Sequence, residues 1–260
     1  MVKIGFEQEF SFKNRSGEYL DFTNSSYELF SPVADAFPVV PEDEQVFDCK
    51  SLEIVPRRCY VEGVERHDES GKLIATDPKG LEIRTTPHTD ISALMDEVRS
   101  SFQTMVQLAK KHGLHPLLVS RNPFAYEARL QTPFNQVELA KRSEKELKIA
   151  LRALLTHGFH INVSVEGFNL QQTQDLAEKI NCYMPYLIPY TFSSPFLHGE
   201  LSGFHCTRTL FRASKRQLVG IDNRKGAYVI QFRGYDPVGR TAILRAVLFL
   251  TRGLALDQSL

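Results

Sequence analysis

Two glutamates at alternate positions near the start of the chain are the first residues whose types and spacing could do chemistry. They are Glu7 and Glu9, in the stretch Gly5-Phe6-Glu7-Gln8-Glu9-Phe10. Side chains alternate between the two faces of a strand, so both carboxylates would lie on one face. Mg²⁺ and Mn²⁺ prefer carboxylate oxygens, so this pair could hold a divalent cation. A solvated edge strand with its acids in water is the plainer alternative.

Three later stretches show the same alternation of polar and apolar residues. They carry Glu82 and Arg84 (residues 80–87), His160, Asn162 and Ser164 (residues 157–164), and Gln231 and Arg233 (residues 229–236). Each stretch alone is typical of a sheet with one face in water. Together they supply acids, a histidine, amides and arginines, whereas an ordinary wet face would be richer in Lys and Thr. We therefore expect four strands to form the floor of a polar cleft, with carboxylates for a cation and arginines for anionic oxygens.

Strands and helices must position these residues, and they follow one another along the sequence without a regular βαβ repeat. Strands are expected at residues 3–12, 52–66, 72–85, 116–120, 160–165 and 228–235, and helices at residues 89–111, 136–156, 170–184 and 241–256. The stretches 13–50, 121–135 and 198–226 are expected to be irregular. This order predicts an α+β fold with a largely antiparallel sheet. Since we find no repeat or linker, one domain over residues 1–260 is expected.

The composition limits the classes of partner. The 260 residues contain 31 Lys plus Arg and 31 Asp plus Glu, so no bulk charge attracts nucleic acid or a membrane surface. Residues 242–256 are apolar but short and carry Arg245 and Arg252, which argues against a membrane span. The four cysteines lack metal-binding spacing and no signal peptide is recognised, so we expect reduced thiols and a cytoplasmic location.

The motifs resemble, in order, those of the carboxylate–amine ligases of the type 2 glutamate–cysteine ligase family, within the glutamine synthetase superfamily. Residues 5–9 are similar to its opening G-x-E-x-E, residues 81–87 to its acid-bearing strand that ends in T-P-P, and residues 158–165 to its G-x-H-V-H-V-G-V strand. Residues 192–196, followed by Gly199, Gly203 and Arg208, resemble its S-S-P-F-W…G…R stretch. The resemblance implies a glutamine synthetase-like fold, in which an antiparallel sheet forms a cleft and helices pack on its other face.

The resemblance also implies an activity. Such ligases use ATP and Mg²⁺ or Mn²⁺ to phosphorylate a carboxylate, and an amine then displaces phosphate from the acyl phosphate. By resemblance, Glu7, Glu9 and Glu82 would bind metal, Arg233 would steady the phosphoryl group, and Arg208 would bind phosphate or a substrate carboxylate. His160, Asn162, Ser164 and Gln231 would line the cofactor site. The substrates would be small molecules of the amino-acid class, and a homo-oligomer or a partner subunit could complete the site.

Three departures from the family pattern keep a second hypothesis open. Gln231 stands where the family has a metal-binding Glu, and Asn162 stands where a second His is usual. The chain also stops about where the family continues with a helical region that carries basic, nucleotide-binding residues. The alternative is therefore a catalytically altered or inactive homologue that acts as a ligand-binding or partner subunit. Glu53 or Glu62 could serve as replacement metal ligands.

A basic stretch within residues 198–226 is a weaker candidate site. It carries His198, His205, Arg208, Arg212, Lys215 and Arg216. The cluster could hold phosphates or an acidic substrate, and a solvated basic loop is the equal alternative. It lacks interleaved aromatic residues, so we expect no nucleic-acid binding.

Overall fold

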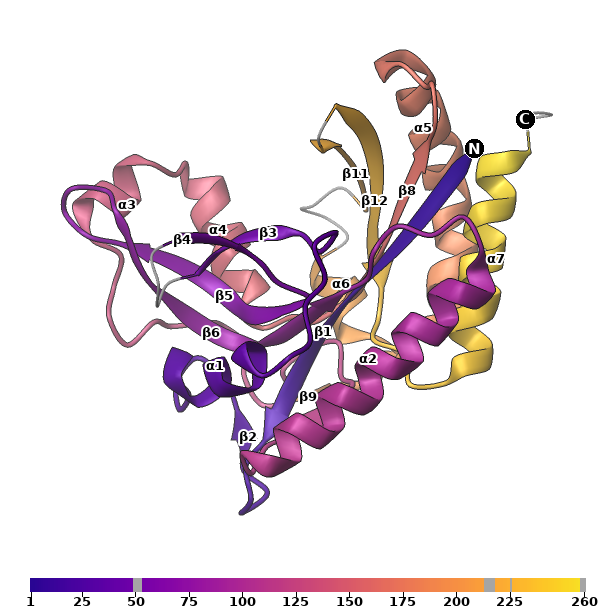
Figure 1. Cartoon of the computed structure of the whole chain (residues 1–260). Coiled ribbons are helices and arrows are strands. Elements are labelled where there is room, and N and C mark those ends of the chain that lie inside the picture. The colour runs from indigo at the N-terminus through magenta and orange to yellow at the C-terminus, as the bar shows by residue number, and fades with distance from the viewer. Residues whose placement is uncertain (49–52, 213–217, 225, 258–260) are drawn as a thin grey trace.

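A computed structural model gives the fold and describes residues 1–48, 53–212, 218–224 and 226–257. Its main feature is a curled antiparallel sheet of eight strands (Figure 1). The main path runs β11 (Val219–Arg224), β12 (Ala227–Tyr235), β8 (Phe159–Val165), β1 (Val2–Lys13), β6 (Leu73–Arg84) and β5 (Cys59–His67). Two short strands, β2 (Tyr19–Leu20) and β7 (His115–Leu117), also pair with β1. The predicted α+β fold with an antiparallel sheet is confirmed.

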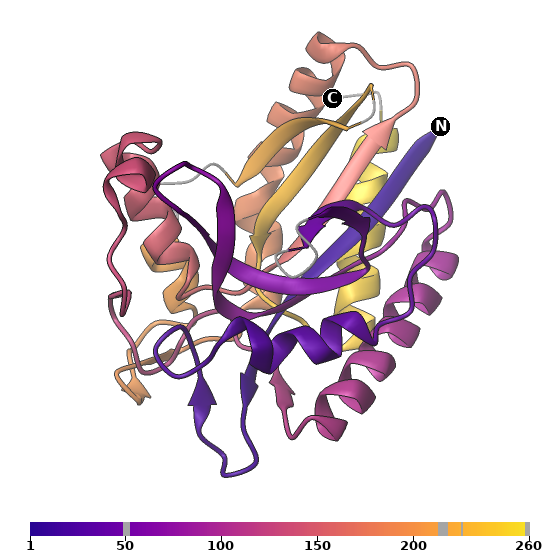
Figure 2. The ribbon, with the colours of Figure 1, turned by 60° about the vertical axis from the view of Figure 1, so that its left-hand side comes forward.

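Three long helices cover one face of this sheet. They are α2 (Ile91–Lys111), α5 (Leu170–Leu187) and α7 (Thr241–Leu256), and in Figure 2 the yellow α7 lies behind the strands. Their apolar stripes pack against the buried side chains of Phe6, Ile161 and Phe232 in one core cluster. The face of β1, β8 and β12 that carries Glu7, His160 and Gln231 points away from these helices. Helix α1 (Tyr27–Asp35) packs with β1, β5 and β6 around a second cluster.

The ends of the long helices follow their sequence signals. Asp90 caps α2 by accepting a hydrogen bond from the Ala93 amide at 2.8 Å, and Gly113 follows the helix with a φ of 74°. Helix α7 has the predicted bounds. No described helix combines the length and the apolar character that a membrane crossing would require.

Several expected elements differ in the structure. The helix expected at residues 136–156 is two helices, α3 (Gln136–Ala140) and α4 (Glu144–Ala153), because Ser143 and Glu146 form a capping box that starts a new helix. The stretch 13–50 contains β2, α1 and β3 (Gln45–Asp48), and β3 pairs with β4 (Glu53–Pro56). The stretch 198–226 contains α6 (Thr207–Arg212) and β11, and the short elements η1 (Ile188–Thr191), β9 (Phe196–Leu197) and β10 (Glu200–Leu201) lie before α6.

An irregularity in β6 positions part of the polar face. Glu62 on β5 pairs with Gly80 on β6, whereas Gly63 pairs with Pro78, so Lys79 is an extra residue in the ladder. Such a bulge redirects the side chain of the extra residue. Gly80 has a φ of 152°, and a Cβ placed on it would lie 2.0 Å from the Phe10 carbonyl oxygen. The close approach of β6 to β1 therefore requires glycine at this position.

Candidate functional site

The four strands predicted to form the cleft floor are neighbours in the sheet, in the order β12, β8, β1 and β6. Glu7 lies opposite His160 on one side and Arg84 on the other, and Glu9 lies opposite Glu82. Asn162 lies opposite Gln231 on the next pair of strands. Residues directly opposite in an antiparallel pair share a face, so the sheet presents these polar side chains on one surface.

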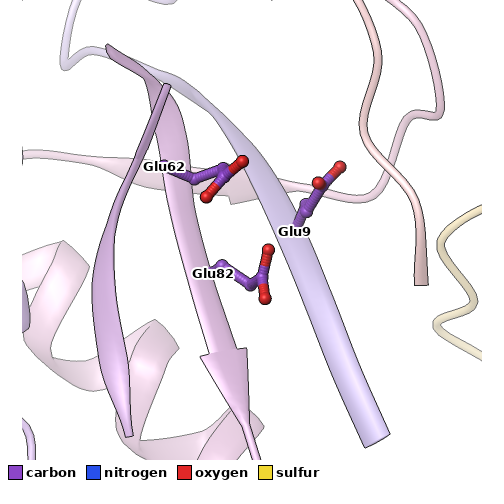
Figure 3. Close-up of side chains that lie close together, drawn as sticks. All are labelled: Glu9, Glu62 and Glu82. Carbon is purple, nitrogen blue, oxygen red and sulfur yellow. The ribbon is translucent and has the colours of Figure 1, made fainter. Parts of the chain in front are cut away.

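Three carboxylates meet on this surface at the β5–β6–β1 end. One carboxylate oxygen from each of Glu9, Glu62 and Glu82 lies within 4.8 Å of the others (Figure 3). Glu9 and Glu82 are two of the predicted metal ligands, and Glu62 is one of the two residues predicted to serve as a replacement metal ligand. Glu53 is exposed on β4 and lies outside this group. Three convergent carboxylates form a donor set suited to a hard divalent cation.

The protonation of the three acids differs with their neighbours. Burial, strengthened by the charges of Glu62, Glu7 and Glu9, raises the pKa of Glu82 to about 8. Burial also raises the pKa of Glu62 to about 6, although Lys79 opposes the shift. Burial acts in the same direction on Glu9, but Lys79 and the nearby histidines outweigh it and lower its pKa to about 2. Without a bound cation, the group therefore carries less than its full negative charge at neutral pH.

Lys79 supplies an internal positive charge to this group. Its buried Nζ lies 2.9 Å from a Glu9 carboxylate oxygen and 3.8 Å from Glu62, and it donates to the Thr156 carbonyl at 2.9 Å. Glu9 is also held by the amide of Gly158, which donates to its second oxygen at 2.7 Å. Strict alternation would place Lys79 on the other face from Glu82, so the sequence pattern missed it.

Glu7 has a different environment from the other two predicted metal ligands. Its carboxylate accepts hydrogen bonds from Asn162 at 2.8 Å and Gln231 at 2.7 Å, and His160 Nδ1 lies 3.1 Å away. Burial raises its pKa, but His160 and the nearby arginines outweigh burial and hold the pKa far below the usual range. Glu7 is not part of the three-acid group. The two residues that depart from the family pattern are therefore both donors to Glu7.

Two arginines lie beside these acids on the polar face. Arg84 lies 2.9 Å from Glu82 and 2.5 Å from Glu44, and its guanidinium carbon lies 4.6 Å from the centre of the Tyr60 ring. Arg224 on β11 lies 3.4 Å from both Glu7 and Glu44. The sequence motifs do not single out Arg224, Glu44 or Tyr60 as site residues. These three come from strands or loops whose positions in the sheet the sequence does not predict.

The two predicted catalytic arginines lie in unlike places. Arg233 on β12 donates to the side chain of Gln231 and lies 3.8 Å from Asp222. Arg208 is buried, donates to the carbonyls of Gly234 and Arg233, and lies 3.4 Å from Asp236. Its two terminal nitrogens thus have partners within the protein, whereas Nε is buried without a hydrogen-bond partner among the described residues. A role of Arg208 as an anion ligand therefore stays a prediction.

The remaining predicted residues lie toward the edges of the site. Ser164 is on β8 opposite Lys3, near the end of the strand that is remote from Gly158 and Glu9. In the basic stretch, Lys215 and Arg216 lie outside the described residues, as does the side chain of Arg212. His198 stacks on Tyr126 rather than on the polar face, with ring centres 5.7 Å apart.

The match to a family model covers most of the chain. The model described as glutamate–cysteine ligase family 2 matches residues 4–226. The chain belongs to the glutamate–cysteine ligase 2 family. The resemblance recognised in the sequence motifs is thereby confirmed.

Curated members of the glutamate–cysteine ligase 2 family are longer than this chain. A protein from Ruegeria pomeroyi with the provisional name glutamate–cysteine ligase 2 is 30% identical over 136 residues, which cover 50% of this chain and 33% of that protein. A protein from Rhodospirillum rubrum with the same provisional name is 34% identical over 107 residues. The match covers 41% of this chain and 26% of that protein. The matches span about a third or less of these two relatives.

Solved structures share the glutamine synthetase-like fold, as predicted. A bifunctional glutathione synthetase from Pasteurella multocida superposes with a TM-score of 0.54 at 12% identity, covering 99% of this chain and 39% of the other. The ligase PafA, in its complex with the prokaryotic ubiquitin-like protein Pup, gives 0.50 at 12% identity, with coverages of 98% and 47%. At this identity the likeness concerns the fold alone.

Proposed function

We propose that this member of the glutamate–cysteine ligase 2 family acts in ATP- and divalent-metal-dependent ligation of a carboxylate to an amine, through an acyl phosphate. The observation that carries the proposal is the convergence of Glu9, Glu62 and Glu82 within 4.8 Å on the polar face of the family's sheet. The family relationship supports the carboxylate–amine ligase class. Amino acids, as small molecules, are the proposed substrates.

The donor set suits one Mg²⁺ or Mn²⁺ ion. We propose Glu9, Glu62 and Glu82 as its ligands, and a bound ion there would neutralise charge on the phosphates of ATP. Around Glu7, two neutral amides replace the family's acid and histidine and donate to the Glu7 carboxylate. We therefore propose that Glu7 orders the cleft through these donors, and that fewer metal ions bind than the family pattern implies.

The cationic side chains would act on the anionic reactants. Arg84 and Arg224 both approach the same carboxylate oxygen of Glu7, and Arg233 lies beside Gln231 on the same face. An arginine can bind a phosphate or carboxylate through two parallel hydrogen bonds. We propose that these three residues orient the phosphoryl group and the substrate carboxylate.

Metal binding is the first test. Titration of the protein with Mn²⁺ by calorimetry should show one site, and Glu62→Gln and Glu82→Gln should each weaken it at least about tenfold, as loss of a charged ligand predicts. Glu53→Gln is the matched control, because Glu53 is exposed outside the group. Unchanged binding by both cleft variants would refute the metal site.

Ligase activity is the second test. Phosphate release should require ATP, Mg²⁺ or Mn²⁺ and both members of a productive pair of amino acid and amine. Release that needs no amine would indicate ATP hydrolysis alone. No phosphate release with any pair, together with intact metal binding, would refute the proposed turnover but not the proposed metal site.

A second candidate is a catalytically altered homologue that binds a ligand or a partner subunit. Three observations favour it: Gln231 and Asn162 donate to Glu7, and Lys79 already places a positive charge beside Glu9 and Glu62. This candidate predicts metal-dependent binding of ATP or a small carboxylate without turnover. Phosphate release that depends on an amine would exclude it.

A further inference from the structure

A cavity of about 390 Å³ lies next to the three-acid group and takes no part in the proposed ligation. The loop at residues 121–128, helix α4 and the end of α6 form its walls. Arg121, Tyr126, Ile149, Leu155, Thr156 and Phe211 are among the lining residues. Its volume is within the range of small-molecule sites, near the lower end.

Arg121 is the unusual residue of this cavity. The side chain is buried, with a relative exposure of 2% for the residue. Its Nη2 donates to the Tyr126 carbonyl at 2.9 Å, whereas Nη1 is buried and has no hydrogen-bond partner in the described part of the chain. Among the described residues no carboxylate forms an ion pair with it. A buried guanidinium without a counter-charge is costly, because desolvation is not offset by an opposite charge.

Aromatic rings hold this guanidinium in place. Its central carbon lies 4.6 Å from the centre of the Phe211 ring and 5.9 Å from that of Tyr126, and these two rings meet edge to face at 5.2 Å. The backbone is fixed as well, because Ser194 Oγ accepts from the Arg121 amide at 3.2 Å and Arg121 forms a β-bridge with Thr156. The guanidinium is therefore held in one orientation, with one buried terminal nitrogen unpaired among the residues that the structure describes.

The other charges around the cavity are mainly positive. Lys148 and Arg152 from α4 line its rim, and their side chains are exposed. Glu127 is the acid among the lining residues, and its carboxylate lies 3.8 Å from Arg129. Lys148 is itself paired with Glu144, one turn earlier on α4, which leaves Arg121 and Arg152 as the lining cations without a carboxylate partner among the described residues. This balance favours an anion in the cavity.

We propose that the cavity binds a small organic anion, with a carboxylate or phosphate head at Arg121 and a flat apolar body against Phe211, Ile149 and Leu155. Nη1 is closed to solvent, so binding includes a shift of the side chains that cover it; the head then supplies the acceptor that Nη1 lacks. The apolar walls bury the body. Thr156 lines the cavity while its carbonyl accepts from Lys79, so the site shares a wall with the three-acid group. Binding requires neither ATP nor metal, so it is tested independently of the ligase proposal.

The test uses benzoate and phenyl phosphate as probes and benzamide as the uncharged control of the same shape. Titration of the full chain, followed by calorimetry or ligand-observed NMR without ATP or metal, should show saturable binding of an anion. Benzamide should bind at least about tenfold more weakly, because a charge-assisted hydrogen bond is lost. The stronger of the two anions identifies a carboxylate or a phosphate as the natural head. Equal binding of benzamide, or no saturable binding of either anion, overturns the proposal.

Variants locate the binding. Arg121→Met should weaken the anion at least about tenfold, and Arg121→Lys should weaken it less while keeping the charge. Lys148→Ala at the exposed rim should weaken it by a smaller factor, and Glu82→Gln in the neighbouring group should leave it unchanged. If Arg121→Met does not fold, the anion affinities of Arg121→Lys and Phe211→Leu test the proposal instead. Wild-type affinity in both of these overturns the proposal.

Discussion

At the residue scale, Lys79 offsets part of the negative charge of the three acids. The Lys79 ammonium lies 2.9 Å from Glu9 and 3.8 Å from Glu62, and it stabilises their negative charge in the absence of a metal ion. A divalent cation bound to the same acids would be repelled by this ammonium. Lys79 therefore supports the fold and limits the affinity of the proposed metal site.

Replacement of Lys79 by methionine should separate these two effects. We expect Lys79→Met to lower the free energy of unfolding by about 3 kcal/mol without metal, because buried acids lose their counter-charge. We also expect tighter Mn²⁺ binding, so that Mn²⁺ recovers part of the stability. Urea unfolding with and without Mn²⁺ measures both. Lys110→Met, on the exposed side of α2, is the control; equal Mn²⁺ affinity in wild type and Lys79→Met would contradict the repulsion.

Glu7 provides a second residue-scale prediction. Glu7→Gln should destabilise the protein by about 2 kcal/mol, because the donors of Asn162, Gln231 and His160 lose a charged acceptor. Mn²⁺ affinity should change by less than about threefold, since a partial loss of long-range charge is worth well under 1 kcal/mol. If Glu7→Gln lost Mn²⁺ binding as strongly as Glu82→Gln, Glu7 would be a ligand after all, as the sequence motif predicted.

At the scale of elements, the bulge in β6 determines the geometry of the three-acid group. The extra residue in the ladder redirects Lys79, and Gly80 allows β6 to approach β1. Glu62 on β5 lies opposite Gly80, so a displacement of β6 there would move two of the three acids relative to Glu9.

Gly80→Ala tests this dependence. A Cβ would meet the Phe10 carbonyl oxygen at 2.0 Å, so the strands must separate, and we expect a loss of stability of about 3 kcal/mol or more together with weaker Mn²⁺ binding. Gly167→Ala is the matched control, because Gly167 also has a positive φ, of 82°, but no atom within 4 Å of the added Cβ. It should cost only about 1 kcal/mol. Similar losses in both variants would argue against the close strand contact.

The elements that the sequence predicted well have local signals, and those it missed depend on partners elsewhere in the fold. Asp90 and Gly113 mark the ends of α2, and strict alternation marks β1 and β8. Lys79 breaks the alternation in β6 through a bulge, which depends on how β5 and β6 pair. The metal-binding roles of Glu7, Glu9 and Glu82 stay predictions, and Glu62 joins the proposed site because β5 lies beside β6.

At the scale of the whole molecule, a buried carboxylate connects α3 to the sheet. Glu138 accepts from Arg66 at 2.9 Å and from the His67 amide at 2.8 Å, and it also caps its own helix. Burial alone would raise the pKa of Glu138, but Arg66 and the two amides outweigh it and lower the pKa to about 2. The ionised form of Glu138 therefore stabilises the folded state.

This shift has a defined pH window. The pKa of Glu138 in the unfolded chain is about 4.5, so its contribution is complete above that value and is lost as the pH falls toward 2. We expect a contribution of about 3 kcal/mol at neutral pH. Urea unfolding of wild type and Glu138→Gln should show this difference at pH 7 and a smaller one near pH 3. A difference that stays constant with pH would show that the charge of Glu138 is not the cause.

The central position of β1 has a consequence for how the chain reaches its fold. β1 is made before its partners β6 and β8, and the contact between Glu7 and His160 joins residues 153 apart in sequence. Contacts so distant form late and slowly, because a long loop must close before any of them is made. Until β8 has been synthesised, the edge of β1 that pairs with β8 has no partner, and the apolar face of β1 lacks its contacts with α5 and α7. We therefore expect this strand to be the segment most exposed to misassembly during synthesis, and the one that most needs protection by chaperones.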